Sequence, residues 1–334
     1  MTEPIAAAFR FLAHFWLEEV KWKDVETIVA LPELSQTLPV INPAALTDLA
    51  AEYQRLFGFN LPPYESIFID PSAMLLAPAT GRVQALYQQG GWQPPAGVRI
   101  GAPDHLGAEL LALADWLAEG HIELAHRLHG QHLALWAPVF VLTLRRLSPP
   151  SFYARLGDLT LDLLLTTLHH GLPPERAPAD HSDPFPDLPP PPVYRGTEDE
   201  LPKDQPDFQN LRDLTIRNTP YEIPNSLGDL IRGLLPPRQV GLFFTREDIA
   251  LLSRSLNLPV GLGERFQMFE SLFRGAGQYE LLPALFDRLR QWLTEAGQAY
   301  HDLAREYPQW APYGRAWGQR LAATQARLET LRAL

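Results

Sequence analysis

The residues best suited to chemistry in this 334-residue sequence are Pro103, Asp104 and His105, which directly precede an apolar run in "GAPDHLGAEL". An aspartate beside a histidine is the composition of a catalytic acid–base pair or of part of a metal site. Either chemistry needs a nucleophile or further ligands, and none stands at a recognisable spacing from this pair. The structural alternative is that Asp104 caps the helix that follows, after an approach stiffened by Pro103. His105 is then the first helical residue and is expected to project outward.

A second set of candidate ligands is the run "HIELAHRLHGQHLALW", in which Glu123 precedes His126, His129 and His132. Positions three apart on a helix differ by about 60° in direction, so the three histidines fan around the axis instead of converging on one ion. We therefore expect no metal, no cofactor and no catalysis. A His-ligated metal hydrolase is the enzyme alternative that metal analysis would decide.

The elements that must position these residues are predicted to be helices. Apolar residues recur at helical spacing in "AAAFRFLAHFWLEEV", in "PAALTDLAAEYQRLFGF", where Gly58 is a predicted stop, and in residues 106–118. The same spacing continues in "QHLALWAPVFVLTLRRL" and "SFYARLGDLTLDLLLTTL". These patterns predict an all-α fold whose first domain is a compact helical bundle over residues 1–170.

A proline-rich acidic segment follows this domain. Residues 171–206 contain 11 prolines in 36 residues, which favours a linker or a strap lying across the domain over a helix. Helical patterns resume near Asp207, with a predicted capping box between Thr245 and Asp248 and three further helices over 264–274, 279–307 and 313–331. Residues 207–334 are predicted to be an appended helical unit. It packs on the first domain, forms a homodimer or grips a partner, and the sequence does not choose among these.

Composition narrows the classes of function. The absence of cysteine excludes disulfides, thiol catalysis and cysteine-ligated metals. The net charge of −11 argues against nucleic-acid binding, and residues 1–170 carry 17 acidic and 10 basic residues, which suits a cationic partner. The N-terminus has no basic segment typical of a secretion signal, and no uncharged run reaches about 18 residues. We expect a cytoplasmic protein with no stable membrane insertion.

Five fragments, taken in order, resemble one known family. They are "PPYESIF", "ALYQQGGW", "APDHLGAELLALADWLAEG", "HLALWAPVF" and "FYARLGDL". This order is similar to that of the TorD/DmsD/NarJ family of molybdoenzyme-maturation chaperones, over roughly residues 40–170. The resemblance implies an all-helical cytoplasmic chaperone without catalysis. Such chaperones bind the apo catalytic subunit of a molybdopterin-dependent oxidoreductase, often through its twin-arginine leader, and delay export until the cofactor is inserted.

The resemblance also implies binding residues. The aromatic motif of the family maps onto Tyr64 and Phe68, and its Pro-Asp-His motif maps onto Pro103, Asp104 and His105. Both motifs are implicated in binding the leader or the apo-enzyme. Two departures matter: family members commonly end soon after the position of His170, and Tyr64 stands where some relatives carry tryptophan.

The spacing and chemistry of these residues predict how they are arranged around a bound peptide. Tyr64 and Phe68 are four positions apart, so on a helix they share a face and are expected to line an apolar groove. Glu65, Asp70 or Asp104 is expected to meet the arginines of a leader, and a neutral His105 to bind peptide backbone. The alternative without molybdoenzymes is a helical protein-interaction scaffold, which shares the fold and the acidic surface.

Overall fold

The computed structural model describes residues 2–38, 40–96, 100–148, 150–170, 183–188 and 226–332. Within these ranges every regular element is helical, apart from one isolated antiparallel bridge between Tyr64 and His105. The predicted all-α fold is confirmed. None of the described helices combines the length and the apolar character that crossing a membrane requires.

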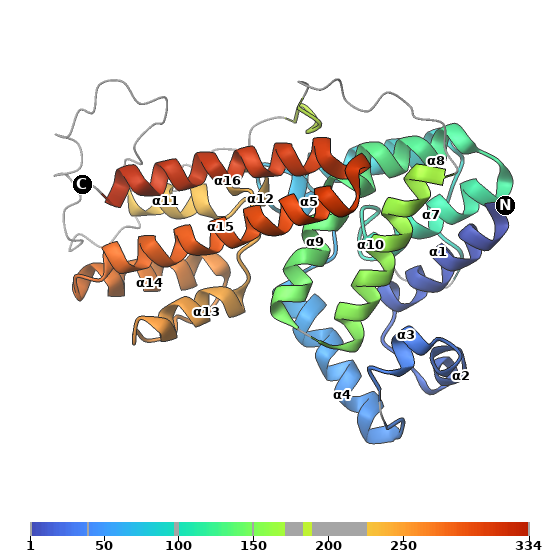
Figure 1. Cartoon of the computed structure of the whole chain (residues 1–334), viewed down its shortest axis with the longest axis horizontal. Coiled ribbons are helices and arrows are strands. Elements are labelled where there is room, and N and C mark those ends of the chain that lie inside the picture. Colours follow the sequence, from blue (N-terminus) through green and yellow to red (C-terminus); the bar gives the residue numbers. More distant parts are fainter. Residues whose placement is uncertain are drawn as a thin grey trace.

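The first half of the chain is built around α1 (Thr2–Leu17) and α7 (Leu106–Glu119), which lie side by side (Figure 1). Their close approach depends on Gly107, where an added Cβ would come within 2.5 Å of Leu17 Cγ and 3.0 Å of the Ala13 carbonyl oxygen. Around this pair lie α2 (Val25–Val29), α3 (Pro32–Ser35), α4 (Pro43–Tyr53), α5 (Glu65–Ile69), α6 (Pro78–Gln89), α8 (Ile122–Leu128), α9 (Ala134–Leu147) and α10 (Phe152–His170).

One predicted helix end is wrong. The helix α4 does not stop at Gly58 but continues as a π-helical stretch, η2 (Gln54–Asn60), because Leu56 and Phe57 are buried there and apolar packing outweighs the weak helix preference of glycine. A second π-helical stretch, η3 (His129–Leu133), joins α8 to α9. It changes the direction of the histidines relative to an ideal helix.

The second half contains α11 (Leu227–Leu234), α12 (Pro237–Val240), α13 (Arg246–Ser255), α14 (Arg265–Gln278), α15 (Leu282–Glu306) and α16 (Ala311–Arg332). The predicted capping box before α13 is confirmed: Asp248 N–H donates to Thr245 Oγ1 at 3.0 Å, and Thr245 N–H donates to Asp248 Oδ2 at 2.8 Å. The three later helices also lie where the periodicity predicts them. The predicted start near Asp207 and the proline run 189–192 lie outside the described residues.

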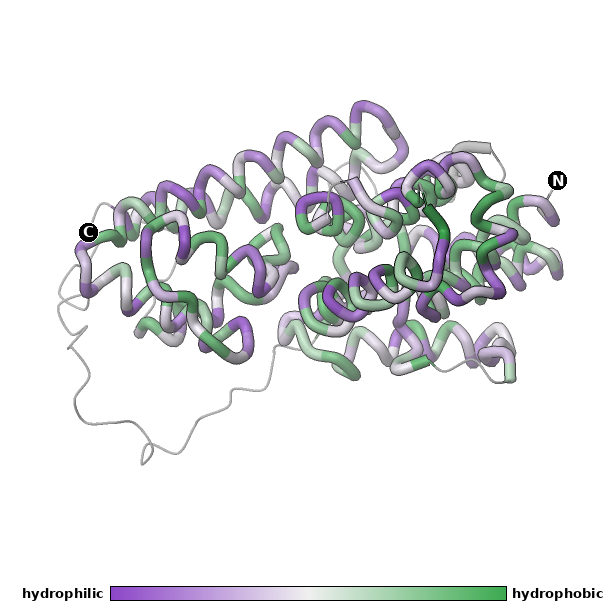
Figure 2. Tube along the Cα trace, turned by 90° about the horizontal axis from the view of Figure 1, so that it is seen from below, coloured by the Kyte–Doolittle hydropathy of each residue, from purple (hydrophilic) through white to green (hydrophobic). Residues whose placement is uncertain are grey.

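The long helices α15 and α16 form an antiparallel pair that reaches from the C-terminal end of the molecule to α9 and α10 (Figure 1). Hydrophilic and hydrophobic residues are interspersed along the helices of the molecule (Figure 2). Trp310 and Trp317 are fully buried, and their indole N–H groups donate to the carbonyl oxygens of Ala134 and Leu135 on α9 at 2.9 and 2.7 Å. The C-terminal helices therefore pack on the first half and share its hydrophobic core.

Candidate functional site

The two motifs that carry the family resemblance meet in space. The N–H of Glu65 donates to the Asp104 carbonyl at 2.9 Å, and the N–H of Leu106 donates to the Pro63 carbonyl at 2.9 Å. These two bonds form the isolated bridge between Tyr64 and His105. Segments about 40 residues apart thus form one unit, which consists of α5 and the Pro-Asp-His turn (residues 103–105).

The capping roles in this turn differ from the prediction. His105, and not Asp104, is the N-cap of α7, since its Nδ1 accepts the N–H of Gly107 at 3.1 Å. Asp104 instead caps the neighbouring helix α5, with Oδ2 accepting the N–H of Ser66 at 2.8 Å. The sequence interpretation assumed a local partner, whereas the bridge between the two segments presents the start of α5 to the aspartate.

His105 does not project outward, which corrects the second expectation for this turn. Its ring packs edge-on against Tyr64 with 4.9 Å between centroids, and only 6% of the residue is exposed. Burial lowers the pKa of His105 to about 4. The expected neutral imidazole is therefore a consequence of desolvation, and its accepting Nδ1 fixes the tautomer that carries the proton on Nε2.

The expected groove between Tyr64 and Phe68 is absent from this structure. Tyr64 precedes α5 in extended conformation, so the two residues do not share a helical face. Phe68 is fully buried and stacks on Phe243 with 5.3 Å between ring centroids. Contact with residues beyond position 240 was not visible in the local pattern, and it turns Phe68 into a core residue.

Three acidic side chains are buried beneath the Pro-Asp-His turn: Glu65, Asp104 and Glu109. Glu65 is already occupied, with Oε2 at 2.7 Å from His132 Nδ1 and Oε1 at 3.2 Å from Arg82 Nη1. Asp70, the other expected arginine partner, is also buried and accepts the N–H groups of Ser72 and Ala79. These side chains organise the protein in this conformation and are not free to meet a cationic peptide.

Glu109 is the least satisfied member of this cluster. Neither carboxylate oxygen has a hydrogen-bond partner among the described residues. Burial, followed by the negative charges of Glu65 and Asp104, raises the pKa of Glu109 well above its ordinary value, and Trp136 and Arg82 offset only part of this. Burial also raises the pKa of Asp104. This environment therefore disfavours the ionised form of Glu109.

The sequence alone did not identify four residues of this buried acidic cluster and its surroundings: Arg82, Glu109, His132 and Trp136. His132 and Trp136 lie within "HLALW" and Glu109 within "APDHLGAELL", so each belongs to a family-like fragment. A charged residue on the apolar stripe of a predicted helix was the available signal for Glu109. The predicted metal alternative finds no support in the geometry: His132 binds Glu65, His129 Nε2 lies 2.9 Å from the Leu164 carbonyl, and the described residues contain no cluster of three or more metal ligands.

An open pocket of about 520 Å³ lies beside the Pro-Asp-His turn. Its aromatic side is the pair Tyr87 and Trp92, whose ring centroids are 4.5 Å apart. Tyr87 Oη donates to the Pro103 carbonyl at 3.1 Å and so connects α6 to the turn. The complete lining is Gln84, Tyr87, Gln88, Gly91, Trp92, Gln93, Pro94, Ile100, Gly101, Ala102, Pro103 and Ala108.

Tyr64 borders this pocket through Gly101. A Cβ at Gly101 would lie 2.5 Å from Tyr64 Oη, so only glycine allows the loop to lie against the tyrosine. Of the residues predicted to bind a client, Pro103 lines the pocket directly. Tyr64, Asp104 and His105 hold the wall to which Pro103 belongs, whereas Glu65 and Phe68 lie in the interior.

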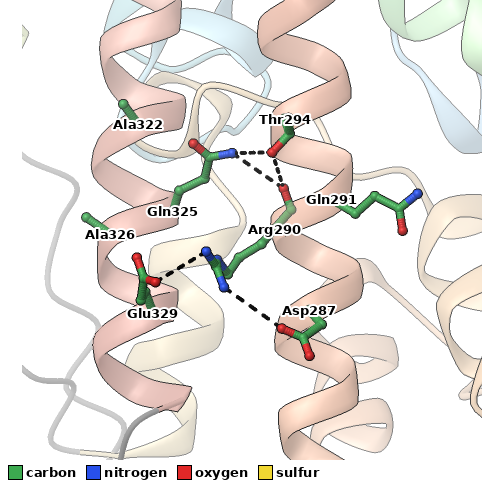
Figure 3. A pocket seen from close by; sticks show the side chains of 8 residues that line it. All are labelled: Asp287, Arg290, Gln291, Thr294, Ala322, Gln325, Ala326 and Glu329. Atoms are coloured by element: carbon green, nitrogen blue, oxygen red, sulfur yellow. Dashed lines mark hydrogen bonds and ion pairs between the residues drawn. The ribbon is translucent and has the colours of Figure 1, made fainter.

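A second pocket, of about 550 Å³, lies between α15 and α16 (Figure 3). Its polar side chains already bind one another: Arg290 lies 3.4 Å from Glu329 and 3.9 Å from Asp287, and Gln325 donates to Thr294 at 2.8 Å. These groups are exposed or partly buried, and they are paired. The pocket offers few free groups to a ligand.

Comparison with known proteins identifies the family-like region. Residues 23–142 match the family model described as nitrate reductase delta subunit, a family of molybdoenzyme-maturation chaperones. This match confirms the resemblance inferred from the five fragments. It includes α5, α6, α7, the Pro-Asp-His turn and the pocket beside it, and it leaves the C-terminal helices unmatched. No curated protein sequence matches the chain.

Proposed function

We propose that this chain, whose residues 23–142 match the nitrate reductase delta subunit family, is a cytoplasmic chaperone for the apo catalytic subunit of a molybdopterin-dependent oxidoreductase. The family supports the general role in molybdoenzyme maturation. The proposal adds that the chain binds this subunit or its twin-arginine leader, acts without catalysis, and delays export until the cofactor has been inserted.

The observation that carries the proposal is the pocket beside the Pro-Asp-His turn. It combines an aromatic and apolar floor with the exposed amides of Gln84, Gln88 and Gln93, and none of the lining residues that the structure describes is charged. Glutamine amides both donate and accept, so they suit the backbone of an extended peptide, while Trp92 and Ile100 suit its apolar side chains. This chemistry fits the apolar middle of a leader better than its arginines.

Most of the motif residues support the wall of this pocket without lining it. Asp104 fixes the start of α5, His105 caps α7, and Tyr64 supports the loop that contains Gly101. Removing one of these groups displaces Pro103 and the pocket wall with it. We therefore assign Tyr64, Glu65, Phe68, Asp104 and His105 to positioning, and Pro103 to direct contact.

The arginines of a leader require carboxylates outside the pocket. One carboxylate in contact with the pocket lining is Asp115, which accepts the Trp92 indole N–H at 2.9 Å and also pairs with Arg10. More generally, residues 1–170 carry an excess of seven negative charges, which attracts a cationic segment at long range. Ordering a flexible peptide opposes binding, so a dissociation constant on the order of 1 µM, or about −8 kcal/mol, is expected.

Purification of the full chain from its native cell, followed by identification of the bound polypeptide, tests the proposal. We expect the apo catalytic subunit of a molybdopterin-dependent oxidoreductase, with its leader still attached. Recovery of unrelated proteins only would instead support the interaction scaffold and contradict the chaperone. The mature, cofactor-loaded enzyme serves as the control, because a maturation chaperone must release it.

A further inference from the structure

A short segment of the proline-rich region lies on the C-terminal helices. Residues 183–188, "DPFPDL", contact α12 and α16, and Phe185 is buried although it lies in neither a helix nor a strand. Asp183 Oδ1 accepts the N–H of Phe185 at 3.2 Å, which fixes a local turn. The segment therefore binds in a bent conformation that Asp183 stabilises. The sequence predicted a linker or a strap lying across the first domain, whereas these residues lie on the C-terminal helices.

Phe185 occupies a groove built from two arginines and a tryptophan. The guanidinium of Arg320 lies 3.6 Å from the centre of the Phe185 ring, and that of Arg238 lies 5.6 Å from it. The Trp317 ring packs edge-on at 4.9 Å between centroids. Cation–π contacts of this kind favour an aromatic occupant over an aliphatic one of the same size.

Polar contacts on either side of Phe185 determine which peptide fits. Asp183 pairs with Arg320 at 2.8 Å, and the carbonyl of Pro186 accepts the Nη2 of Arg238 at 2.6 Å. The groove thus recognises an acidic side chain two positions before the aromatic ring and one carbonyl directly after it. A proline after the aromatic residue keeps the chain extended at that carbonyl.

The segment carries a charge that compensates the two arginines of the groove. Both guanidinium groups face the Phe185 ring, and Asp183 pairs with Arg320. Burial, together with the neighbouring charge of Arg320, lowers the pKa of Arg238, whereas Asp183 acts in the opposite direction. Arg238 also donates to the carbonyl of Ile69 at the end of α5, so the occupied groove adjoins the helix that Asp104 caps.

We propose that the groove between α12 and α16, formed by Arg238, Trp317 and Arg320, is a binding site for Asp-x-Phe-Pro segments. Its occupant is the chain's own residues 183–186, which bind it as a tethered ligand. This site is separate from the pocket beside the Pro-Asp-His turn and lies outside the region that the family model matches.

A labelled synthetic peptide of residues 182–188, titrated into the full-length chain by fluorescence anisotropy, tests this site. The Phe185→Ala chain, whose groove is vacated, is expected to bind the peptide with a dissociation constant on the order of 0.1 mM. Wild-type chain should bind at least about ten-fold more weakly, because its tethered segment competes at a millimolar effective concentration. The Asp187→Ala chain is the matched control, since Asp187 is exposed in the same segment, and it should behave as wild type.

Two further samples make the result decisive. Adding Arg320→Ala to the Phe185→Ala chain should abolish binding, and so should a peptide in which the phenylalanine is alanine. An Asp183→Asn chain, which keeps the ring in place, is expected to bind the peptide a few-fold more tightly than wild type and replaces the Phe185→Ala chain if that variant fails to fold. Equal binding by wild type and both variants, or undiminished binding of the alanine peptide, would overturn the proposal.

Discussion

The acidic cluster of Glu65, Asp104 and Glu109 at the Pro-Asp-His turn and the aromatic seam of Trp310 and Trp317 against α9 are both buried, yet they are built in opposite ways. Beneath the turn, Glu65 binds both Arg82 and His132, Asp104 accepts a backbone N–H, and the two Glu109 oxygens have no hydrogen-bond partner among the described residues. Along the seam, large apolar rings fill the space, and the polar edges of Trp310 and Trp317 each find a backbone carbonyl. Buried polar groups thus lack hydrogen-bond partners in the first region, whereas the two indole N–H groups of the second region both have one.

This difference indicates where stability and function are located. Unsatisfied buried polar groups cost free energy and persist where a site needs them, whereas filled and bonded aromatic seams contribute to the free energy of folding. We expect substitutions in the seam to destabilise the protein strongly. Substitutions in the acidic cluster should change how the protein's stability depends on pH, and its binding of a client, more than its stability at a single pH.

The largest effect is expected at Trp317. Replacing this fully buried residue by alanine leaves a cavity and removes the indole hydrogen bond to the Leu135 carbonyl, which should lower the free energy of unfolding by about 3–5 kcal/mol in urea titrations. Trp22, which is 61% exposed, is the matched control, and Trp22→Ala should stay within about 0.5 kcal/mol of wild type. Equal losses in the two variants would mean that the seam does not stabilise the chain.

An intermediate effect is expected at Asp248, which joins the two halves of the chain. It closes the capping box of α13 and accepts two bonds from Arg146 on α9, at 3.1 and 2.7 Å. Asp248→Ala should cost about 2–3 kcal/mol in chemical denaturation. Its partly exposed neighbour Glu247 pairs with Arg55 and accepts a hydrogen bond from Asn60, and Glu247→Ala should cost less than about 1 kcal/mol. A similar cost at both positions would contradict the central role of Asp248.

The smallest effect on stability is expected at Glu109, and it is specific to the buried acidic cluster. Because its pKa is raised in the folded state, the folded protein holds a proton that the unfolded chain releases, so the Glu109 contribution falls as pH rises above about 4.5. Glu109→Gln should therefore gain stability relative to wild type as pH rises from about 5 to 8, measured by thermal denaturation. The buried His105 and His129, whose pKa is lowered to about 4, make stability rise with pH instead. Because both proteins keep these histidines, the difference in stability between variant and wild type reports on Glu109 alone.

Glu123 provides the control for this titration, since it is exposed on the neighbouring helix α8. Glu123→Gln should show a difference from wild type that does not change with pH. A Glu109→Gln variant whose stability parallels that of wild type at every pH would mean that Glu109 is ionised in the folded protein, in contact with Arg82.

Local patterns were sufficient to predict the helices and the motifs. Helical spacing predicted α1, α7, α9, α10 and the three last helices, and side-chain chemistry predicted the capping box at Thr245. The family-like fragments predicted that the segments around Tyr64 and His105 belong to one site, and the bridge between them brings these segments together. These features depend on residues within a few positions of one another or on a motif known as a unit.

Contacts between distant segments were not predictable in this way. The sequence places Asp104 beside its own helix, and only the fold brings the start of α5 closer. Phe68 looked suitable for a groove because its partner Phe243 lies 175 positions away. The pocket beside the turn was missed for the same reason, since its lining comes from α6, from the loop after it and from the Pro-Asp-His turn.

The central claim is that the pocket beside the Pro-Asp-His turn binds the leader, and two adjacent glutamines test it most directly. Gln88 lines the pocket, whereas Gln89 lies outside it and binds Arg127. In calorimetric titrations with the leader peptide of the co-purifying subunit, Gln88→Ala should weaken binding about three- to ten-fold, the equivalent of one hydrogen bond, and Gln89→Ala should leave it unchanged. Equal affinities for wild type and both variants would contradict the account.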